Sequence, residues 1–149
     1  MSLTSYLTTA LIAGVAGAAA MEFVMWLITR TGWAHGNMIV ALGSLLTRTR
    51  EKAFGVGLIV HACAGVAFAA CYLLAMQKLG LTAFPAAVGV GLLLGFLHGS
   101  VVCLALVWMV SDEHPLPEFR EASFAVGLTH LAGHLAYGAV VGLVVGLTR

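Results

Sequence analysis

Charged residues are scarce in this sequence. Asp, Glu, Lys and Arg make up 9% of its 149 residues, against about 25% in a typical soluble domain. Lys and Arg number 7 and Asp and Glu number 6, so the formal net charge is only +1. The sequence has no cluster of basic residues to bind the phosphates of a nucleic acid. It also has too few polar residues to form the surface of a soluble globular domain. The composition therefore argues against a soluble, disordered or nucleic-acid-binding protein.

Cysteine and proline are also rare, with 3 residues of each. Cys63, Cys71 and Cys103 all lie in apolar runs, and their spacing matches neither a zinc knuckle nor a redox pair. We interpret them as small apolar packing residues.

Long apolar runs dominate the rest of the chain, which is 61% hydrophobic. A membrane-crossing helix needs about 20 apolar residues, and four runs reach this length. The runs lack the period-two alternation of membrane barrel strands. The sequence therefore predicts one transmembrane domain over residues 1–149. Its fold class is all-α, an integral membrane four-helix antiparallel bundle with spans at about residues 6–29, 53–77, 85–111 and 122–148.

The connections between these spans carry most of the charges. The first connection includes an apolar stretch at about residues 38–46, which predicts a short helix lying in the membrane interface. The short connection at 78–82 predicts a tight antiparallel hairpin of the second and third spans. Lys78 and Arg149 are the only Lys or Arg residues on one side, whereas the two long connections hold Arg30, Arg48, Arg50, Lys52 and Arg120. We therefore expect both long connections in the cytoplasm and both termini outside.

Five ionisable residues lie inside the predicted spans. With a rise of about 1.5 Å per residue, three of them lie about 12–13 Å from the cytoplasmic end and two about 19–21 Å. The first level holds Glu22, His61 and His130, and the deeper level holds His98 and His134. Each lies on the stripe of small residues of its helix, the face through which membrane helices pack. All five side chains are therefore expected to point into the bundle.

An ionisable group in hydrocarbon costs at least a few kcal/mol unless it has a partner. The i, i+4 spacing of His130 and His134 lets two imidazoles bind one ion, and imidazole with carboxylate suits transition metals. The sequence therefore predicts a mono- or dinuclear site for Fe, Cu or Zn with the five residues as ligands. Such a site would serve metal handling or redox chemistry, the latter as a metal-dependent membrane oxidoreductase.

Other residues are candidates to contact the ligands or to form an entry path for the ion. Those that could contact the ligands are Tyr137, Ser100 and Met25. Those that could form a cytoplasmic entry funnel for a cation are His35, Asp112, Glu113 and His114. A solvated loop explains the second group equally well.

Three other functions stay open. Two histidines on different helices, such as His61 and His134, could be the axial ligands of a b-type haem. A chain of Glu and His side chains could relay protons in a proton-coupled transporter. The chain could also be a structural subunit of a larger membrane complex, or a homo-oligomer. In every case the lipid bilayer is a partner and nucleic acid is not.

Three segments carry a family resemblance: AGVAGAAAMEFVM at 13–25, HACAGVAFAACY at 61–72 and HLAGHLAYGAVVGLVVG at 130–146. They resemble small four-helix prokaryotic membrane proteins of unknown function, the YagU-like group. The residues that match the pattern best are His61, His134, Tyr137 and Gly138, whereas Glu22 and the DEHPLPEF segment do not map onto it. The resemblance implies four spans in a prokaryotic inner membrane, and it supplies no reaction.

Overall fold

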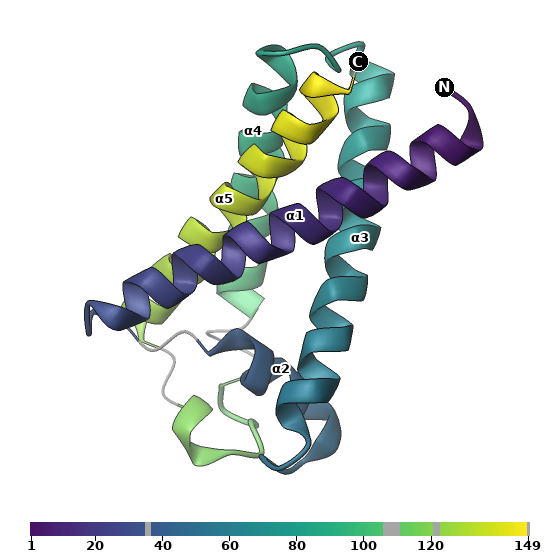
Figure 1. The fold of residues 1–149 in the computed structure, drawn as a ribbon. Helices are drawn as coiled ribbons and strands as arrows, with labels where there is room; N and C mark the ends of the chain where they lie inside the picture. The colour runs from purple at the N-terminus through teal and green to yellow at the C-terminus, as the bar shows by residue number, and fades with distance from the viewer. Residues whose placement is uncertain (35–36, 106–110, 121–122, 149) are drawn as a thin grey trace.

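A computed structural model describes the chain except for residues 35–36, 106–110, 121–122 and 149 (Figure 1). Within the described residues all regular structure is helical. The elements are α1 (Leu3–Arg30), α2 (Met38–Thr47), α3 (Ala53–Leu79), α4 (Ala86–Ala105), the short 3-10 turn η2 (Pro117–Phe119) and α5 (Phe124–Leu147).

Four of these helices are long and apolar enough to cross a membrane. They are α1, α3, α4 and α5, with mean hydropathies between 1.6 and 2.1. The protein is therefore a multi-pass membrane protein built as a four-helix bundle, as the sequence predicts. The shorter α2 coincides with the interfacial helix predicted at 38–46. Residues 106–110 of the third predicted span lie outside the described part of the chain.

Polar residues at the helix ends explain where several helices begin and end. The side chains of Ser2, Asn37 and Ser123 accept hydrogen bonds from the first turns of α1, α2 and α5, which satisfies backbone N–H groups that have no partner within the helix. Gly80 ends α3 with a φ of 69°, a left-handed conformation that glycine adopts without strain. The third span is predicted to begin at residue 85, and α4 begins at Ala86, directly after Pro85.

The four long helices of the bundle pack in the order α4, α5, α1, α3, and the bundle is open between α3 and α4. α4 packs along α5, α5 packs on α1, and α1 packs on α3, while α3 makes few contacts with α4 or α5. Half of the apolar window of α5 is buried, against 17% of that of α3, so α5 is the central helix. The predicted tight hairpin of the second and third spans is therefore wrong. The chain connects α3 to α4 at one end (Figure 1), and the two helices make few contacts along their length.

Glycines explain why α4 packs on α5 instead. A Cβ added at Gly91 would collide with the carbonyl oxygen of Gly138, and one at Gly138 would collide with the carbonyl oxygen of Gly91. The two backbones are thus in direct contact, which is the usual role of small residues between membrane helices. Gly43 of α2 and Gly57 of α3 meet in the same way and hold α2 against the start of α3.

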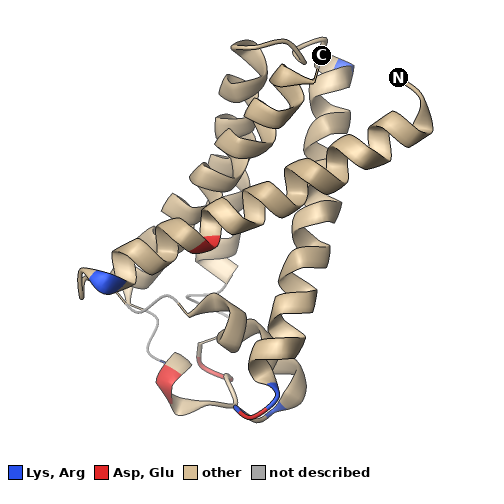
Figure 2. Ribbon diagram, viewed as in Figure 1, with Lys and Arg blue, Asp and Glu red and all other residues tan. Residues whose placement is uncertain are grey.

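The two ends of the molecule differ in charge. Both termini and the α3–α4 connection lie at one end, whereas α2, η2 and their loops lie at the other (Figure 1). Most charged residues gather around α2 and η2, and the middle of the helices is uncharged apart from Glu22 in α1 (Figure 2). The two long connections therefore share one end, as the sequence predicts.

Candidate functional site

Glu22 and His61 face each other across the contact between α1 and α3. The helices approach closely one turn away, where Gly65 of α3 lies against Ala18 of α1. Glu22 Oε1 is 3.4 Å from His61 Nε2, and the two side chains are 29% and 12% exposed. Both atoms are buried, and neither has a hydrogen-bond partner among the described residues. A carboxylate oxygen and a ring nitrogen are thus held together without a well-aligned hydrogen bond.

His98 and His134 form a second pair, between α4 and α5. Their ring centroids are 4.7 Å apart in an edge-to-face arrangement. Phe68 of α3 packs on the His98 ring, with centroids 4.0 Å apart. The hydroxyl of Tyr72 lies 3.3 Å from His98 Nδ1, within hydrogen-bond distance. The His98 ring is therefore held between two aromatic side chains of α3 and the imidazole of α5.

Backbone hydrogen bonds fix the protonation of the two histidines in α5. His130 Nδ1 is 2.8 Å from the carbonyl oxygen of Val126, and His134 Nδ1 is 2.8 Å from that of His130. A carbonyl oxygen only accepts, so we assign the proton of each neutral ring to Nδ1. Each Nε2 then carries a lone pair, which can accept a hydrogen bond or bind a metal ion.

All four membrane histidines line one cavity of about 210 Å³. The cavity lies among α1, α2, α3, α4 and α5, and apart from the imidazoles and the Tyr137 ring its walls are aliphatic, aromatic or glycine. The other lining residues are Ala18, Met21, Met38, Ala41, Leu42, Leu45, Ala64, Gly65, Phe68, Val102 and His114. The imidazoles are therefore the main polar groups that a molecule in this cavity would meet.

The five predicted ligands do not converge on one point. They divide into the Glu22–His61 pair, the His98–His134 pair, and His130 one turn before His134. In the described part of the chain, no three His, Cys, Asp or Glu side chains come close enough together to hold a metal ion. Both contacts nevertheless join residues that the depth estimate places at the same level.

The three predicted supporting residues have different surroundings. The Tyr137 hydroxyl donates to the carbonyl oxygen of Gly65, 2.5 Å away, so Tyr137 connects α5 to α3. Met25 is fully buried and packs against Gly133, between the two histidines of α5. Ser100 donates to Phe96 of its own helix and does not line the cavity.

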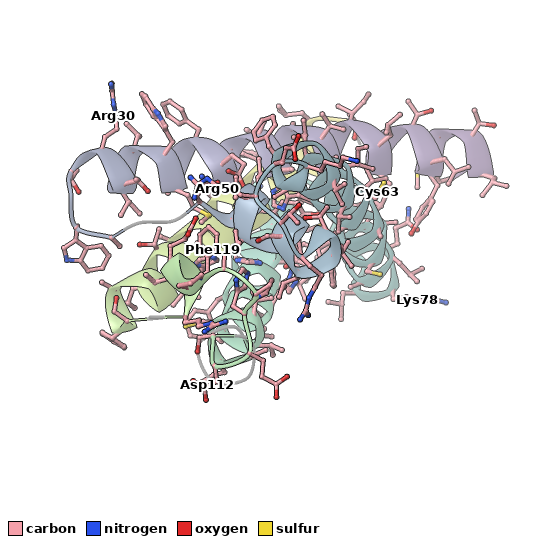
Figure 3. All side chains as sticks on the ribbon, turned by 90° about the horizontal axis from the view of Figure 1, so that it is seen from below. Arg30, Arg50, Cys63, Lys78, Asp112 and Phe119 are labelled. Carbon is pink, nitrogen blue, oxygen red and sulfur yellow. The ribbon has the colours of Figure 1, made fainter. Side chains whose placement is uncertain are left out.

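The residues predicted to form a cation funnel also separate. His114 is only 2% exposed and lines the cavity, and its Nε2 lies 3.1 Å from the carbonyl oxygen of Ala41 in α2. Asp112 and Glu113 are exposed, and Asp112 lies at the outer edge of the molecule (Figure 3). His35 lies outside the described residues. Of the described candidates, then, only His114 lines the cavity.

An ion pair holds η2 against the loop between α2 and α3. Arg50 of that loop pairs with Glu118 of η2, and Arg50 and Phe119 line the same surface pocket (Figure 3). Arg120 Nε donates to the carbonyl oxygen of His114 over 2.7 Å. Segment 111–120 is therefore fixed across the end of the cavity.

Sequence reasoning missed Tyr72 and Phe68, which both contact His98. A signal for Tyr72 existed: it follows His61 by 11 residues, about three helical turns, and therefore lies on the same face of α3. Phe68 follows His61 by seven residues, about two helical turns, so it lies on the same face. Its contact with His98, at 41% exposure, depends on how α3 and α4 are rotated relative to each other.

A search of protein families, of curated proteins and of solved structures finds no match to this chain.

Proposed function

We propose that this chain is a membrane-embedded transition-metal-binding protein whose ion is bound by Glu22 and His61. The observation that carries the proposal is the 3.4 Å separation of two buried atoms, Glu22 Oε1 and His61 Nε2, that lack hydrogen-bond partners among the described residues. Metal bonds to oxygen and nitrogen ligands are about 2.0–2.2 Å long, so two ligands of a tetrahedral ion lie about 3.4 Å apart. The separation suits a shared ion.

The cost of burying these groups supports the same assignment. A polar atom in hydrocarbon without a partner costs several kcal/mol, so intramembrane carboxylates are found paired or bound to ions. The part of the chain that the structure describes offers Glu22 no Lys or Arg partner, since its ion pair is with His61. A divalent cation between the two side chains would satisfy both atoms at once.

The remaining ligands would come from the histidines that line the cavity. His130 is the first candidate because the depth estimate places it at the level of Glu22 and His61. Its Nδ1–H is held by a backbone carbonyl, which is the usual support of a metal-ligating imidazole and leaves Nε2 to bind. His130 would complete a three-residue site, with His98 and His134 available to a second ion. This donor set suits Zn, Fe or Cu, for metal handling or for an oxidoreductase.

The proposed location is a prokaryotic inner membrane, with both long connections in the cytoplasm. The larger number of Lys and Arg residues at the α2 and η2 end supports this orientation. The resemblance to the YagU-like group supports the location.

Of the alternatives, haem has the weaker support. A cavity of about 210 Å³ is smaller than the 300–1,000 Å³ of typical pockets for drug-sized ligands, and a haem is larger than most such ligands. A proton relay has a specific observation in its favour, because Glu22 and His61 could share a proton instead of an ion.

The proposal is tested by titrating Co²⁺, a visible-absorbing stand-in for the native metal, into chelator-treated protein in detergent. The wild type is expected to develop the absorption of a four-coordinate ion. Glu22→Gln and His61→Phe should each weaken binding at least about ten-fold, since each loses a ligand. The matched control is Glu51→Gln, an exposed acid in the α2–α3 loop, which should bind as the wild type does.

Two results would overturn the proposal. One is Glu22→Gln binding Co²⁺ as tightly as the wild type while eluting as the same monodisperse species. The other is a wild type that binds no Co²⁺. If the wild type also carries a proton flux in liposomes that Glu22→Gln abolishes, the proton relay replaces the metal site.

A further inference from the structure

We propose that the histidine-lined cavity binds the ring of a phenol or hydroquinone that enters from the bilayer. The ring would lie in the His98–His134 part of the cavity, whether or not a metal ion is bound at Glu22 and His61.

The cavity has the size of one substituted ring. Its volume is about 210 Å³, whereas an apolar cavity of about 150 Å³ in another protein is known to bind benzene. Its walls are mostly apolar, so they favour an apolar molecule over water. Phe68 and His98 offer aromatic faces or edges, with ring centroids only 4.0 Å apart. Such a surface suits an aromatic ring.

The imidazole of His134 determines which polar group the ring must carry. Its Nδ1–H donates to the carbonyl oxygen of His130, so in the neutral ring Nε2 can only accept. His134 lines the cavity, and a ligand there satisfies Nε2 by donating a hydrogen bond. A hydroxyl on an aromatic ring meets both requirements. A quinone carbonyl or an ether does not, because both only accept.

The route into the cavity is lateral. At the end near η2, residues of α2 such as Leu42 and Leu45 line it together with the buried His114, which hydrogen-bonds to Ala41. Between α3 and α4 there are few contacts, and Phe68, at 41% exposure, stands at this edge. A ligand from the lipid could therefore place its ring at His134 while an apolar tail stays between α3 and α4 in the bilayer.

The test uses para-fluorophenol as the probe and para-fluoroanisole, its methyl ether, as the matched compound without a donor. Binding to protein in lipid nanodiscs is followed by fluorine NMR, with protein-free nanodiscs correcting for partition into lipid. The phenol is expected to bind at least ten-fold more tightly than the ether. His134→Phe, which keeps a ring but removes the acceptor, should abolish this preference.

A second pair of variants distinguishes the loss of a binding site from the loss of the folded structure. Ala64→Leu fills the cavity from α3 and should abolish phenol binding, whereas Ala67→Leu, at an exposed position of the same helix, should not change it. Equal binding of phenol and ether, or unchanged phenol binding in Ala64→Leu, would overturn the proposal. Metal content measured on the same samples separates the two proposals, since His134→Phe should keep the ion at Glu22 and His61.

Discussion

Tyr137 shows how one polar side chain connects two helices that otherwise make few contacts. Its ring lies beneath Gly17 of α1, where a Cβ would be crowded by the ring carbons. Its hydroxyl donates to the carbonyl oxygen of Gly65 in α3. The side chain is 3% exposed, so water cannot replace this bond. Tyr137 therefore ties α5 to α3 at the cavity, which both Gly65 and Tyr137 line.

Removing that hydroxyl should destabilise the bundle measurably. Tyr137→Phe is expected to lose between about 0.6 kcal/mol, the average measured for hydrogen bonds between membrane helices, and about 1.7 kcal/mol, the largest value. The measurement is unfolding by SDS titration in mixed micelles. Tyr6→Phe is the matched control. The Tyr6 hydroxyl, near the start of α1, also donates to a carbonyl oxygen of α3, that of Ala70, but it is less buried. An equal or larger loss in Tyr6→Phe would contradict the role given to Tyr137.

At the scale of single residues, the sequence predicted the depth of a side chain in the membrane better than the side chains that it contacts. The helical rise is fixed, so the distance of Glu22 and His61 from the membrane edge followed from counting residues. The burial of His114 did not follow, because it depends on how segment 111–120 folds back onto α2. The contact of Tyr72 with His98 depends in the same way on the relative rotation of α3 and α4.

At the scale of helices, the sequence predicted the elements but not their order of packing. Length and apolarity fix a membrane helix, so the predicted spans at 6–29 and 53–77 differ from α1 and α3 by only a few residues. Stripes of small residues occur on every helix, however, and they do not tell which helix packs on which. The open edge between α3 and α4 could therefore be found only from the structure.

The contact between α4 and α5 offers a test with an internal control. Gly91→Ala would place a Cβ against the carbonyl oxygen of Gly138, and such overpacking should cost about 1–3 kcal/mol. Gly89 lies two residues earlier in α4 with open space around it. Gly89→Ala should therefore be neutral or add up to about 1 kcal/mol, since alanine favours the helix.

Thermal unfolding in detergent, followed by circular dichroism, compares these two variants. Gly91→Ala should melt below the wild type and Gly89→Ala at or above it. Similar melting of the two variants would mean that α4 and α5 do not pack through their glycines.

For the whole molecule, the distribution of Lys and Arg residues predicts an orientation in the membrane that can be tested. We expect a cysteine at Leu81, in the α3–α4 connection, to react with a membrane-impermeant maleimide on intact cells. A cysteine at Glu118 should react only after the membrane is opened. The background replaces the native Cys63, Cys71 and Cys103 with alanine. The reverse pattern of labelling would invert the proposed orientation.

Binding of a metal ion and the stability of the folded bundle should depend on each other. The ion proposed at Glu22 and His61 would join α1 to α3, and the cavity beside it is enclosed by residues of all five α-helices. A bound ion stabilises the folded state because the unfolded chain offers no preformed site. Removing the metal should therefore lower the melting temperature of the wild type and leave that of Glu22→Gln unchanged.

The presence of a metal ion is best tested by measuring metal content per chain, with inductively coupled plasma mass spectrometry on gently purified protein. We expect about one equivalent of a transition metal in the wild type, as for one filled His/Glu site, and a clear loss in Glu22→Gln. Wild-type protein without a transition metal, even from cells grown with added Fe, Cu and Zn, would contradict it.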